Sequence, residues 1–300
     1  MRQLGGVIAA MPTPLTEALE PDLAAVPALL DDLVDQGCHG ALVLGTTGEG
    51  PSFSVAEREA ILTTAAAWRA AGGHDHFVMV GGSGCANLPE TIALSRHAIE
   101  LGYDAVLVVP PYFFKHVTAV GVARAYAAVL DELPDDARLL LYHIPQVTGV
   151  PVGPEVISSL RSSYGPLVAG LKDSGADLAA TRSLIATFPE LVVLTGTDSH
   201  LLPALDAGAA GCITALASAC GDILRAAYDA QRAGTATPAD RSRLEALRQA
   251  AEGFPLAAAV KTLLHDRRRL GPWPVRPPLV DLSPAEREDL VTAVRRALAP

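Results

Sequence analysis

The sequence predicts one α/β fold, a (β/α)8 TIM barrel with additional C-terminal helices. Short apolar runs rich in β-branched residues recur along the chain. Each run ends at a Gly, Pro, Thr or Ser residue or shortly before one. Segments with helical spacing, rich in Ala, Leu, Glu and Arg, lie between these runs. Half of the residues are hydrophobic and 19% are charged, against roughly 25% charged residues in an average soluble protein. These proportions exclude a disordered chain and predict a large buried core.

Eight apolar runs are the expected strands. Their residues are apolar almost without interruption, as in parallel strands that are buried on both faces. A doubly wound sheet would usually contain fewer strands, and no linker divides the chain into two domains. Eight strand–helix units therefore predict a single closed barrel. The runs span residues 6–11, 40–45, 76–82, 104–109, 138–144, 167–172, 191–196 and 211–216.

The segments between the strands are expected to be helices. Residues 55–70 follow Ser54, and Glu57 completes the pattern of a capping box at the start of a helix. Residues 88–102 are a second example. After the eighth strand the helical pattern continues further than one barrel helix requires. We therefore expect a catalytic barrel over residues 1–220 and a C-terminal helical extension over residues 221–300, packed on the barrel.

Charge and cysteine content limit the partners and the location. The net charge is −10, so neither nucleic acid nor an anionic membrane surface is an expected partner. No run approaches the ~18 uninterrupted apolar residues of a membrane helix. Pro12 and Pro14 break the first apolar run, which favours a first strand over a signal peptide. Four scattered cysteines without a close pair favour a reducing, cytoplasmic location. They are Cys38, Cys85, Cys212 and Cys220.

Lysine is rare in this chain, which makes each lysine informative. Only three of the 23 basic residues are lysines. Lys172 closes an apolar strand, so its amine is expected at the dry mouth of the barrel, where an amine can act as a Schiff-base nucleophile. A structural ion pair of Lys172 with Asp173 or another acid is the alternative. Lys115 is expected on the surface, and Lys261 on a helix with its ammonium group in solvent.

Hydroxyl groups are expected beside Lys172. Tyr142 ends the preceding strand, and a phenol next to an amine can transfer protons and stabilise an oxyanion. An aromatic residue that merely fills the barrel is an equally good explanation of Tyr142 alone. Thr46 and Thr47 lie on a glycine-flanked turn that could hold a carboxylate. Such turns are common after strands, so this turn has little weight by itself.

Several longer motifs stand in order at the expected strand ends and in the C-terminal segment. They are GTTGEG (45–50), PPYFF (110–114), YHIP (142–145), GLKDS (170–174), GTDS (196–199), AGCIT (210–214) and VRPPLVDLSPAERE (275–288). With these motifs, nearly the whole chain resembles the pyruvate-dependent class I aldolases typified by dihydrodipicolinate synthase and N-acetylneuraminate lyase.

The resemblance implies a role for each matching residue. Lys172 forms an imine with pyruvate or another 2-oxo acid, and Tyr142 relays protons. Thr46 and Thr47 receive the carboxylate of pyruvate, with Thr47 also counted among the catalytic residues. Gly196 and Ile213 contribute backbone contacts to the substrate. The imine is the electron sink of the reaction, so the resemblance implies no metal and no cofactor.

The sequence departs from the synthase pattern at two positions. In dihydrodipicolinate synthase an arginine that binds the carboxylate of the aldehyde substrate follows the YNVP-like turn, but Val147 occupies that place here. The synthase also has a pair of tyrosines that completes a proton relay across a subunit interface. Here Tyr112 is followed by Phe113. Both departures weaken the synthase assignment.

Three further residues bear on the substrate. Ser174 completes a Lys-Asp-Ser turn, as in relatives that cleave 2-keto-3-deoxy sugar acids or 4-hydroxy-2-oxoglutarate. Asp198 matches one of the acidic residues with which sialic acid lyases hold sugar hydroxyls, although a helix cap is as good an explanation. His143 should point away from Tyr142 because side chains alternate along a strand, which favours a packed residue over a substrate contact.

We therefore expect an aldolase that cleaves a hydroxylated 2-oxo acid to pyruvate and an aldehyde. Dihydrodipicolinate synthase is the main alternative, followed by a dehydratase that uses the same imine. Two other classes are a non-catalytic regulator that binds 2-oxo acids and a metal-dependent enzyme that uses His74, His76 or His200. The resemblance also implies a homotetramer, a dimer of dimers, with Tyr112 and Phe113 near the tight interface.

Overall fold

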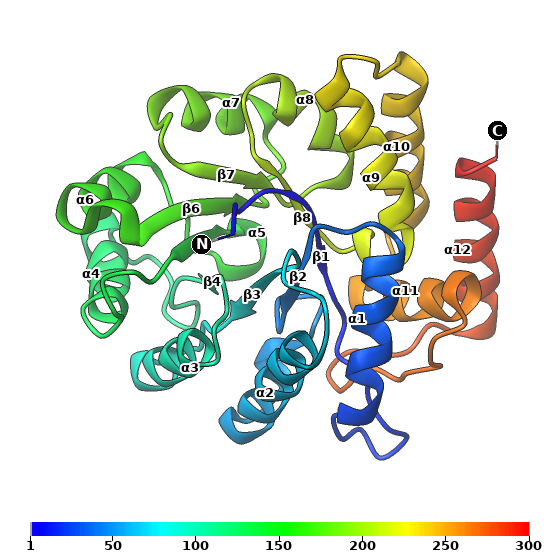
Figure 1. The fold of residues 1–300 in the computed structure, drawn as a ribbon, viewed down its shortest axis with the longest axis horizontal. Coiled ribbons are helices and arrows are strands. Elements are labelled where there is room, and N and C mark those ends of the chain that lie inside the picture. Colours follow the sequence, from blue (N-terminus) through cyan, green and yellow to red (C-terminus); the bar gives the residue numbers. More distant parts are fainter. Residues whose placement is uncertain (1, 300) are drawn as a thin grey trace.

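The computed structural model describes residues 2–299 and contains a closed barrel of eight parallel strands (Figure 1). Each strand pairs with the next in the sequence, and β8 closes the barrel by pairing with β1. The predicted fold class is confirmed. The strands are β1 (Gly6–Ala10), β2 (Gly40–Val43), β3 (Val78–Gly82), β4 (Ala105–Val108), β5 (Leu139–His143), β6 (Val168–Asp173), β7 (Val192–Thr195) and β8 (Gly211–Thr214).

The strands are apolar throughout because both of their faces are buried. On β1, Ile8 belongs to the apolar cluster inside the barrel, whereas Val7 and Ala9 belong to the cluster between the barrel and its helices. The inner cluster also contains Leu42, Leu140, Leu194 and Ile213. The barrel is therefore filled with side chains, and substrate can reach only its ends.

Helices surround the barrel and follow the strands in sequence. The capping box predicted at Ser54 is confirmed, because the Ser54 hydroxyl accepts from the N–H of Glu57 and the Glu57 carboxylate accepts from the N–H of Ser54. The helices up to the end of the barrel are α1 (Val26–Asp35), α2 (Val55–Ala71), α3 (Leu88–Glu100), α4 (Ala119–Leu130), α5 (Pro145–Thr148), α6 (Pro154–Tyr164), α7 (Leu178–Thr187), α8 (Leu201–Asp206) and α9 (Ala217–Ala233).

Three further α-helices lie together on one side of the barrel (Figure 1). They are α10 (Pro238–Ala251), α11 (Leu256–Leu263), which continues as a π-helix over Leu264–Arg268, and α12 (Pro284–Ala297). The boundary expected at residue 220 falls inside α9, which packs against β1 as the eighth barrel helix. We propose that the barrel ends with α9 and that the extension begins after it. Among residues 2–299, no helix is both long and apolar enough to cross a membrane.

A buried ion pair joins this extension to the loop after β2. Lys261 on α11 is 2% exposed and donates hydrogen bonds to Glu49 Oε1 at 2.5 Å and to the carbonyl of Pro274 at 2.6 Å. The second carboxylate oxygen of Glu49 accepts from the N–H of Arg276 at 2.8 Å. Burial lowers the pKa of Lys261, although the negative charge of Glu49 opposes this effect. The prediction of a solvent-exposed Lys261 ammonium group is wrong, because its partner is brought to it by the tertiary fold.

We predict that Lys261→Met lowers the free energy of unfolding by about 3–5 kcal/mol, because it leaves the Glu49 carboxylate buried without its counter-ion. Urea denaturation followed by circular dichroism measures this loss. The control is Glu49→Gln combined with Lys261→Met, which removes both charges and should cost clearly less than the single variant. Equal losses in the two proteins would contradict the role given to the ion pair.

Candidate active site

Two neighbouring strands bring the candidate nucleophile and the candidate proton relay together. Tyr142 near the end of β5 is paired in register with Lys172 on β6. The Lys172 ammonium donates a hydrogen bond of 3.1 Å to the Tyr142 hydroxyl and lies 4.3 Å from the centroid of the tyrosine ring. The two side chains are 4% and 5% exposed. Both therefore sit at the C-terminal end of the barrel and are almost fully removed from water.

Lys172 does not pair with Asp173. The Asp173 carboxylate accepts from the Thr181 hydroxyl at 2.6 Å and from the N–H of Gly175 at 2.9 Å. Adjacent residues of a strand point to opposite faces, so Asp173 faces the surrounding helices whereas Lys172 faces the barrel axis. The ion pair of Lys172 with Asp173 is absent for this reason, and the Lys172 ammonium donates to Tyr142 instead.

The loop after β2 adds a hydroxyl to this pair. Thr46 Oγ1 lies 3.2 Å from the Tyr142 hydroxyl, and either group can donate the hydrogen. Thr46 is exposed to the space above the barrel, whereas Thr47 is 4% exposed. The turn is tight, since a Cβ atom at Gly50 would lie 2.4 Å from the carbonyl oxygen of Leu44. Glycine at that position lets the loop fold back on itself and present its threonines to Tyr142.

The surroundings of Tyr142 favour its ionised form. Burial by itself raises the pKa of this phenol, but the charge of Lys172 and hydrogen bonds from Thr46, Lys172 and Ser174 outweigh burial and lower it. A phenol with a lowered pKa gives up and takes back a proton more readily near neutral pH. Tyr142 is therefore chemically suited to relay protons and is not merely filling the barrel.

Gly196 and Ser174 form one closely packed unit. The N–H of Gly196 donates to the carbonyl of Asp173 at 2.6 Å, and the N–H of Ser174 donates to the carbonyl of His143. A Cβ atom at position 196 would lie only 1.9 Å from Ser174 Oγ. Gly196 thus leaves the room in which the Ser174 side chain lies, close to Tyr142. This supporting role was not visible in the sequence.

Asp198 occupies an unusual position. Its side chain is 1% exposed, neither carboxylate oxygen has a hydrogen-bond partner among the described residues, and Arg248 lies 3.8 Å away. Burial raises its pKa, although Thr214 and Arg248 oppose this effect. Thr197, not Asp198, is at the cap position of the short 3-10 helix at residues 198–200, so the helix-cap alternative is wrong. Asp198 does not line the open cavity above Thr46 and Tyr142 that is described below.

The other predicted residues have defined places. Ile213 on β8 belongs to the apolar cluster inside the barrel. The ring of His143 faces outward and accepts from the N–H of Val152 at 3.1 Å, which confirms its packed role. Phe113 is 72% exposed on the loop after β4. His74 stacks on Trp68, and no group of three or more His, Cys, Asp or Glu side chains within residues 2–299 could hold a metal ion.

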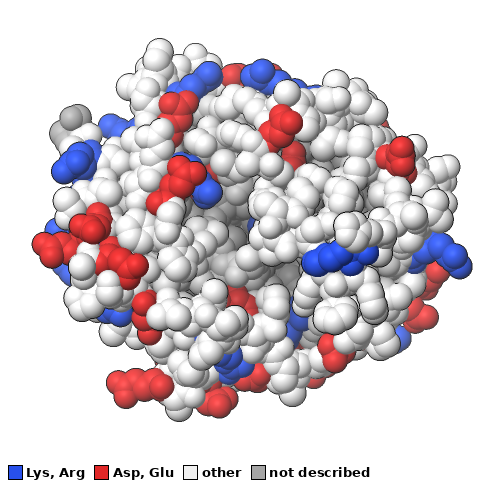
Figure 2. Space-filling view, turned by 180° about the vertical axis from the view of Figure 1, so that it is seen from behind, with Lys and Arg blue, Asp and Glu red and all other residues white. Residues whose placement is uncertain are grey.

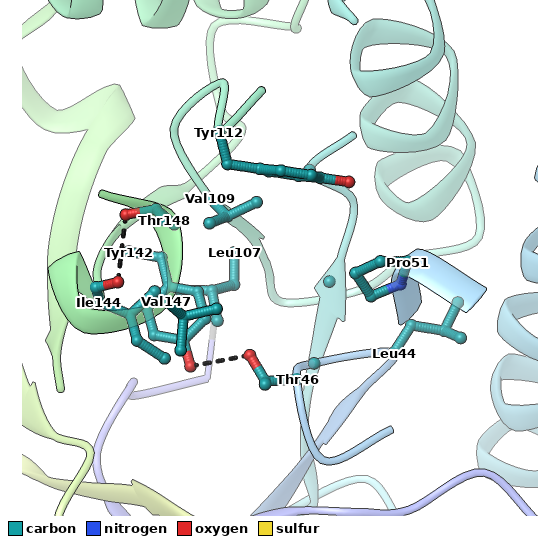
Figure 3. Close-up of a pocket in the computed structure, with 13 residues that line it drawn as sticks. Leu44, Thr46, Pro51, Leu107, Val109, Tyr112, Tyr142, Ile144, Val147 and Thr148 are labelled. Carbon is teal, nitrogen blue, oxygen red and sulfur yellow. Dashed lines mark hydrogen bonds between the residues drawn. The ribbon is translucent and has the colours of Figure 1, made fainter. Parts of the chain in front are cut away.

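An open cavity lies above the Thr46–Tyr142 contact (Figure 3). It encloses about 580 Å³ including its mouth and is formed by the ends of β2 to β5 with the loops that follow them. Tyr112 and Val147 line it, but Lys172 does not, although its amine contacts the Tyr142 hydroxyl. Figure 2 shows that the face opposite to that of Figure 1 is hollowed near its centre and mostly uncharged there.

Most of the cavity wall was not singled out from the sequence. Apart from Val147, its apolar residues lie beside or within the motifs but are not among the chemical groups that the sequence singles out. They are Leu44, Pro51, Leu107, Val109 and Ile144. Their positions in the sequence could have indicated them, because they lie one or two residues from a strand end or within a turn. In this fold the C-terminal strand ends and the turns that follow them face the active site.

Comparison with known proteins identifies the family of the chain. The model of the dihydrodipicolinate synthetase family matches residues 3–297. The chain belongs to this family. A DapA-like lyase of Chloroflexus aurantiacus, itself uncharacterised, is 43% identical over 300 residues, which cover all of this chain and 99% of that protein. The 4-hydroxy-tetrahydrodipicolinate synthase of Listeria innocua is 32% identical over 99% of both chains.

Solved structures of the family have the same fold. YagE, a prophage protein of Escherichia coli K12 solved in complex with pyruvate, superposes with a TM-score of 0.91 at 27% identity over 98% of both chains. The CdNal protein of Clostridium difficile, solved with mannosamine, has a TM-score of 0.88 at 21% identity, a likeness that concerns the fold alone. The members of this family include lyases, and the chain is an enzyme of the carbon–carbon lyase class.

We predict that Lys172→Met moves the ionisation of Tyr142 to higher pH, because it removes the positive charge and a hydrogen bond and leaves the burial that raises the pKa. The tyrosinate absorbance is followed during a pH titration, and the difference from Tyr142→Phe isolates this residue. An unchanged titration in the Lys172→Met protein would show that the ammonium group does not control Tyr142.

Proposed function

We propose that the protein is a class I, Schiff-base-forming, pyruvate-dependent aldolase that cleaves a 4-hydroxy-2-oxo acid to pyruvate and an aldehyde. The chain of contacts from the Lys172 amine through the Tyr142 hydroxyl to Thr46 carries this proposal. It supplies a nucleophile, a proton relay and a hydroxyl beside an open cavity, which are the groups that imine chemistry at a carbonyl requires.

The reaction begins with imine formation. The Lys172 amine attacks the keto carbon of the substrate, and loss of water leaves a protonated imine. The carboxylate next to the keto carbon is held by the N–H groups and hydroxyls of Thr46 and Thr47, whose turn faces Tyr142. Tyr142 delivers and removes the protons of the addition and dehydration steps, since its hydroxyl contacts both Lys172 and Thr46.

Cleavage then breaks the bond between C3 and C4 of the substrate. The C4 hydroxyl loses its proton to the Tyr142 phenolate, the C4 carbon leaves as an aldehyde, and the bonding electron pair passes into the imine to give a neutral enamine. Protonation at C3 and hydrolysis of the imine by water release pyruvate and regenerate the Lys172 amine. No oxidant, reductant, metal ion or cofactor enters this balance.

The similarity to a family member solved with pyruvate supports the choice of 2-oxo acid. Position 147 supports cleavage of a 4-hydroxy-2-oxo acid over dihydrodipicolinate synthesis, although relatives at 32% identity have the synthase name. Val147 lines the cavity and cannot form an ion pair with the carboxylate of aspartate semialdehyde. We therefore expect little or no condensation of pyruvate with aspartate semialdehyde, and efficient condensation would favour the synthase.

The same proposal includes the location and the assembly. All four cysteines are free and buried, which suits a reducing cytoplasm. Phe113 and Phe114 are 72% and 68% exposed on one loop, and apolar side chains so exposed are typical of a covered surface. We propose that the protein is a cytoplasmic homotetramer in which Tyr112 and Phe113 lie near an interface.

We predict that borohydride reduction in the presence of pyruvate leaves a stable pyruvyl adduct on Lys172. Digestion and peptide mass spectrometry locate the modified lysine, and Lys172→Ala should yield no adduct. Lys115→Met is a matched control that removes an exposed lysine and should still be modified at Lys172. A folded protein without any adduct would overturn the imine mechanism and leave a protein that only binds 2-oxo acids.

A further inference from the structure

We infer that the aldehyde released by this enzyme carries an uncharged, apolar substituent, such as an alkyl chain or an aromatic ring. This inference rests on the proposed function and concerns the group attached to C4 of the substrate. It goes beyond the reaction type, because the mechanism at C2 to C4 is the same for an apolar group, a carboxylate and a polyhydroxylated chain. The cavity distinguishes these three groups.

The substituent on C4 has one direction in which to extend. The Thr46–Tyr142 contact forms the floor of the cavity (Figure 3). Lys172 contacts the Tyr142 hydroxyl but is not among the residues that line the cavity. Below the floor the barrel is filled by apolar side chains such as Leu140 and Leu194. With the keto carbon held at Lys172, the far end of the substrate must therefore occupy the space above Thr46 and Tyr142.

The walls of that space are apolar. Ile144 and Val147, from the segment after β5, form one side, and Leu44 and Pro51, from the segment after β2, form the opposite side (Figure 3). The ring of Tyr112 extends across the space and offers a flat aromatic surface. A flexible alkyl group or a planar ring fits between such walls, because each buried CH₂ contributes favourably when it leaves water.

The hydroxyl groups of the wall offer little to a polar substituent. Thr148 Oγ1 lies 3.1 Å from the carbonyl oxygen of Ile144, 2.9 Å from that of Val150 and 3.1 Å from the N–H of Val150, so its own loop satisfies it. Thr46 is engaged with Tyr142. Among the lining residues of the described chain, the Tyr112 hydroxyl is the remaining side-chain group that could bind a polar substituent. A sugar-like chain carries several hydroxyls and would need more partners than this one.

No charged side chain lines the cavity within residues 2–299. Two cations lie near the cavity but donate mainly to backbone carbonyls of its walls. Arg58, 3% exposed, donates to the carbonyls of Gly82 and Gly84 and to the sulfur of Cys85, and its buried Nε has no partner among the described residues. Lys115 at the rim is exposed and donates to the carbonyls of Tyr112 at 2.5 Å and Thr148 at 2.6 Å.

A charged or polyhydroxylated substituent would lose its water in this cavity without receiving equivalent hydrogen bonds. Such desolvation opposes binding, whereas the same walls favour an apolar group. Differences of this kind change kcat/KM by roughly tenfold or more between substrates of similar size. The structure therefore favours an apolar aldehyde over both succinic semialdehyde and a short sugar aldehyde.

The test measures condensation of pyruvate with butanal, succinic semialdehyde and erythrose, three aldehydes of equal carbon number that carry a methyl end, a carboxylate and hydroxyls. Benzaldehyde is added to probe stacking on Tyr112. We expect kcat/KM for butanal or benzaldehyde to exceed both polar aldehydes by roughly tenfold or more. A preference for succinic semialdehyde or erythrose overturns the inference.

Two variants at position 147 are a matched pair for the same assay. Val147→Arg places a cation in the cavity wall and is expected to raise kcat/KM for succinic semialdehyde relative to butanal by roughly tenfold, because a carboxylate then has a partner. Val147→Met adds length without charge and should keep the preference for butanal. If both variants shift the preference equally, charge does not determine the choice and the inference fails.

Lys115→Met tests the competing explanation that the rim lysine turns to a substrate carboxylate. The inference requires that this variant keep the wild-type order of aldehydes. Pyruvyl-adduct formation on Lys172 is measured in parallel. It distinguishes failure of the proposed function from failure of this inference alone. No adduct overturns both the proposed function and this inference, whereas an adduct without condensation of butanal or benzaldehyde overturns only the inference.

Discussion

The parallel pairing of β5 with β6 is the contact on which the rest of this site depends. The register places Tyr142 opposite Lys172, so the phenol and the amine share a hydrogen bond at the dry end of the barrel. The charge of Lys172 opposes the effect of burial and lowers the pKa of Tyr142. A shift of one residue would turn one of the two side chains outward and separate the amine from the phenol.

The loop after β2 depends in turn on a charge buried far from the reacting atoms. Glu49 belongs to the same turn as Thr46 and is held by Lys261 from α11 and by the N–H of Arg276. The C-terminal helices thus fix the turn that faces Tyr142, which gives them a part in the site although they contribute none of its reacting groups. Stability and function are connected through this ion pair.

The walls of the cavity are apolar, whereas its floor is polar. The floor is the contact between the hydroxyl groups of Thr46 and Tyr142, which can transfer protons, whereas the walls are apolar side chains such as Val109 and Ile144. Under the proposed function, the small polar contact supplies the chemistry that all substrates would share. Selectivity would then depend on the shape and polarity of the walls, where Val147 offers no partner to a carboxylate.

The sequence by itself determined the barrel, because strands buried on both faces must be apolar throughout and helices between them must be amphipathic. It also singled out Lys172, Tyr142, Thr46 and Thr47 as candidate site residues, since residues at the C-terminal ends of barrel strands face the active site. The tertiary structure alone decided the partners of Lys261 and Asp198 and the apolar walls around Val147. Those contacts join residues far apart in the chain, and no local pattern records which side chains meet when the barrel closes.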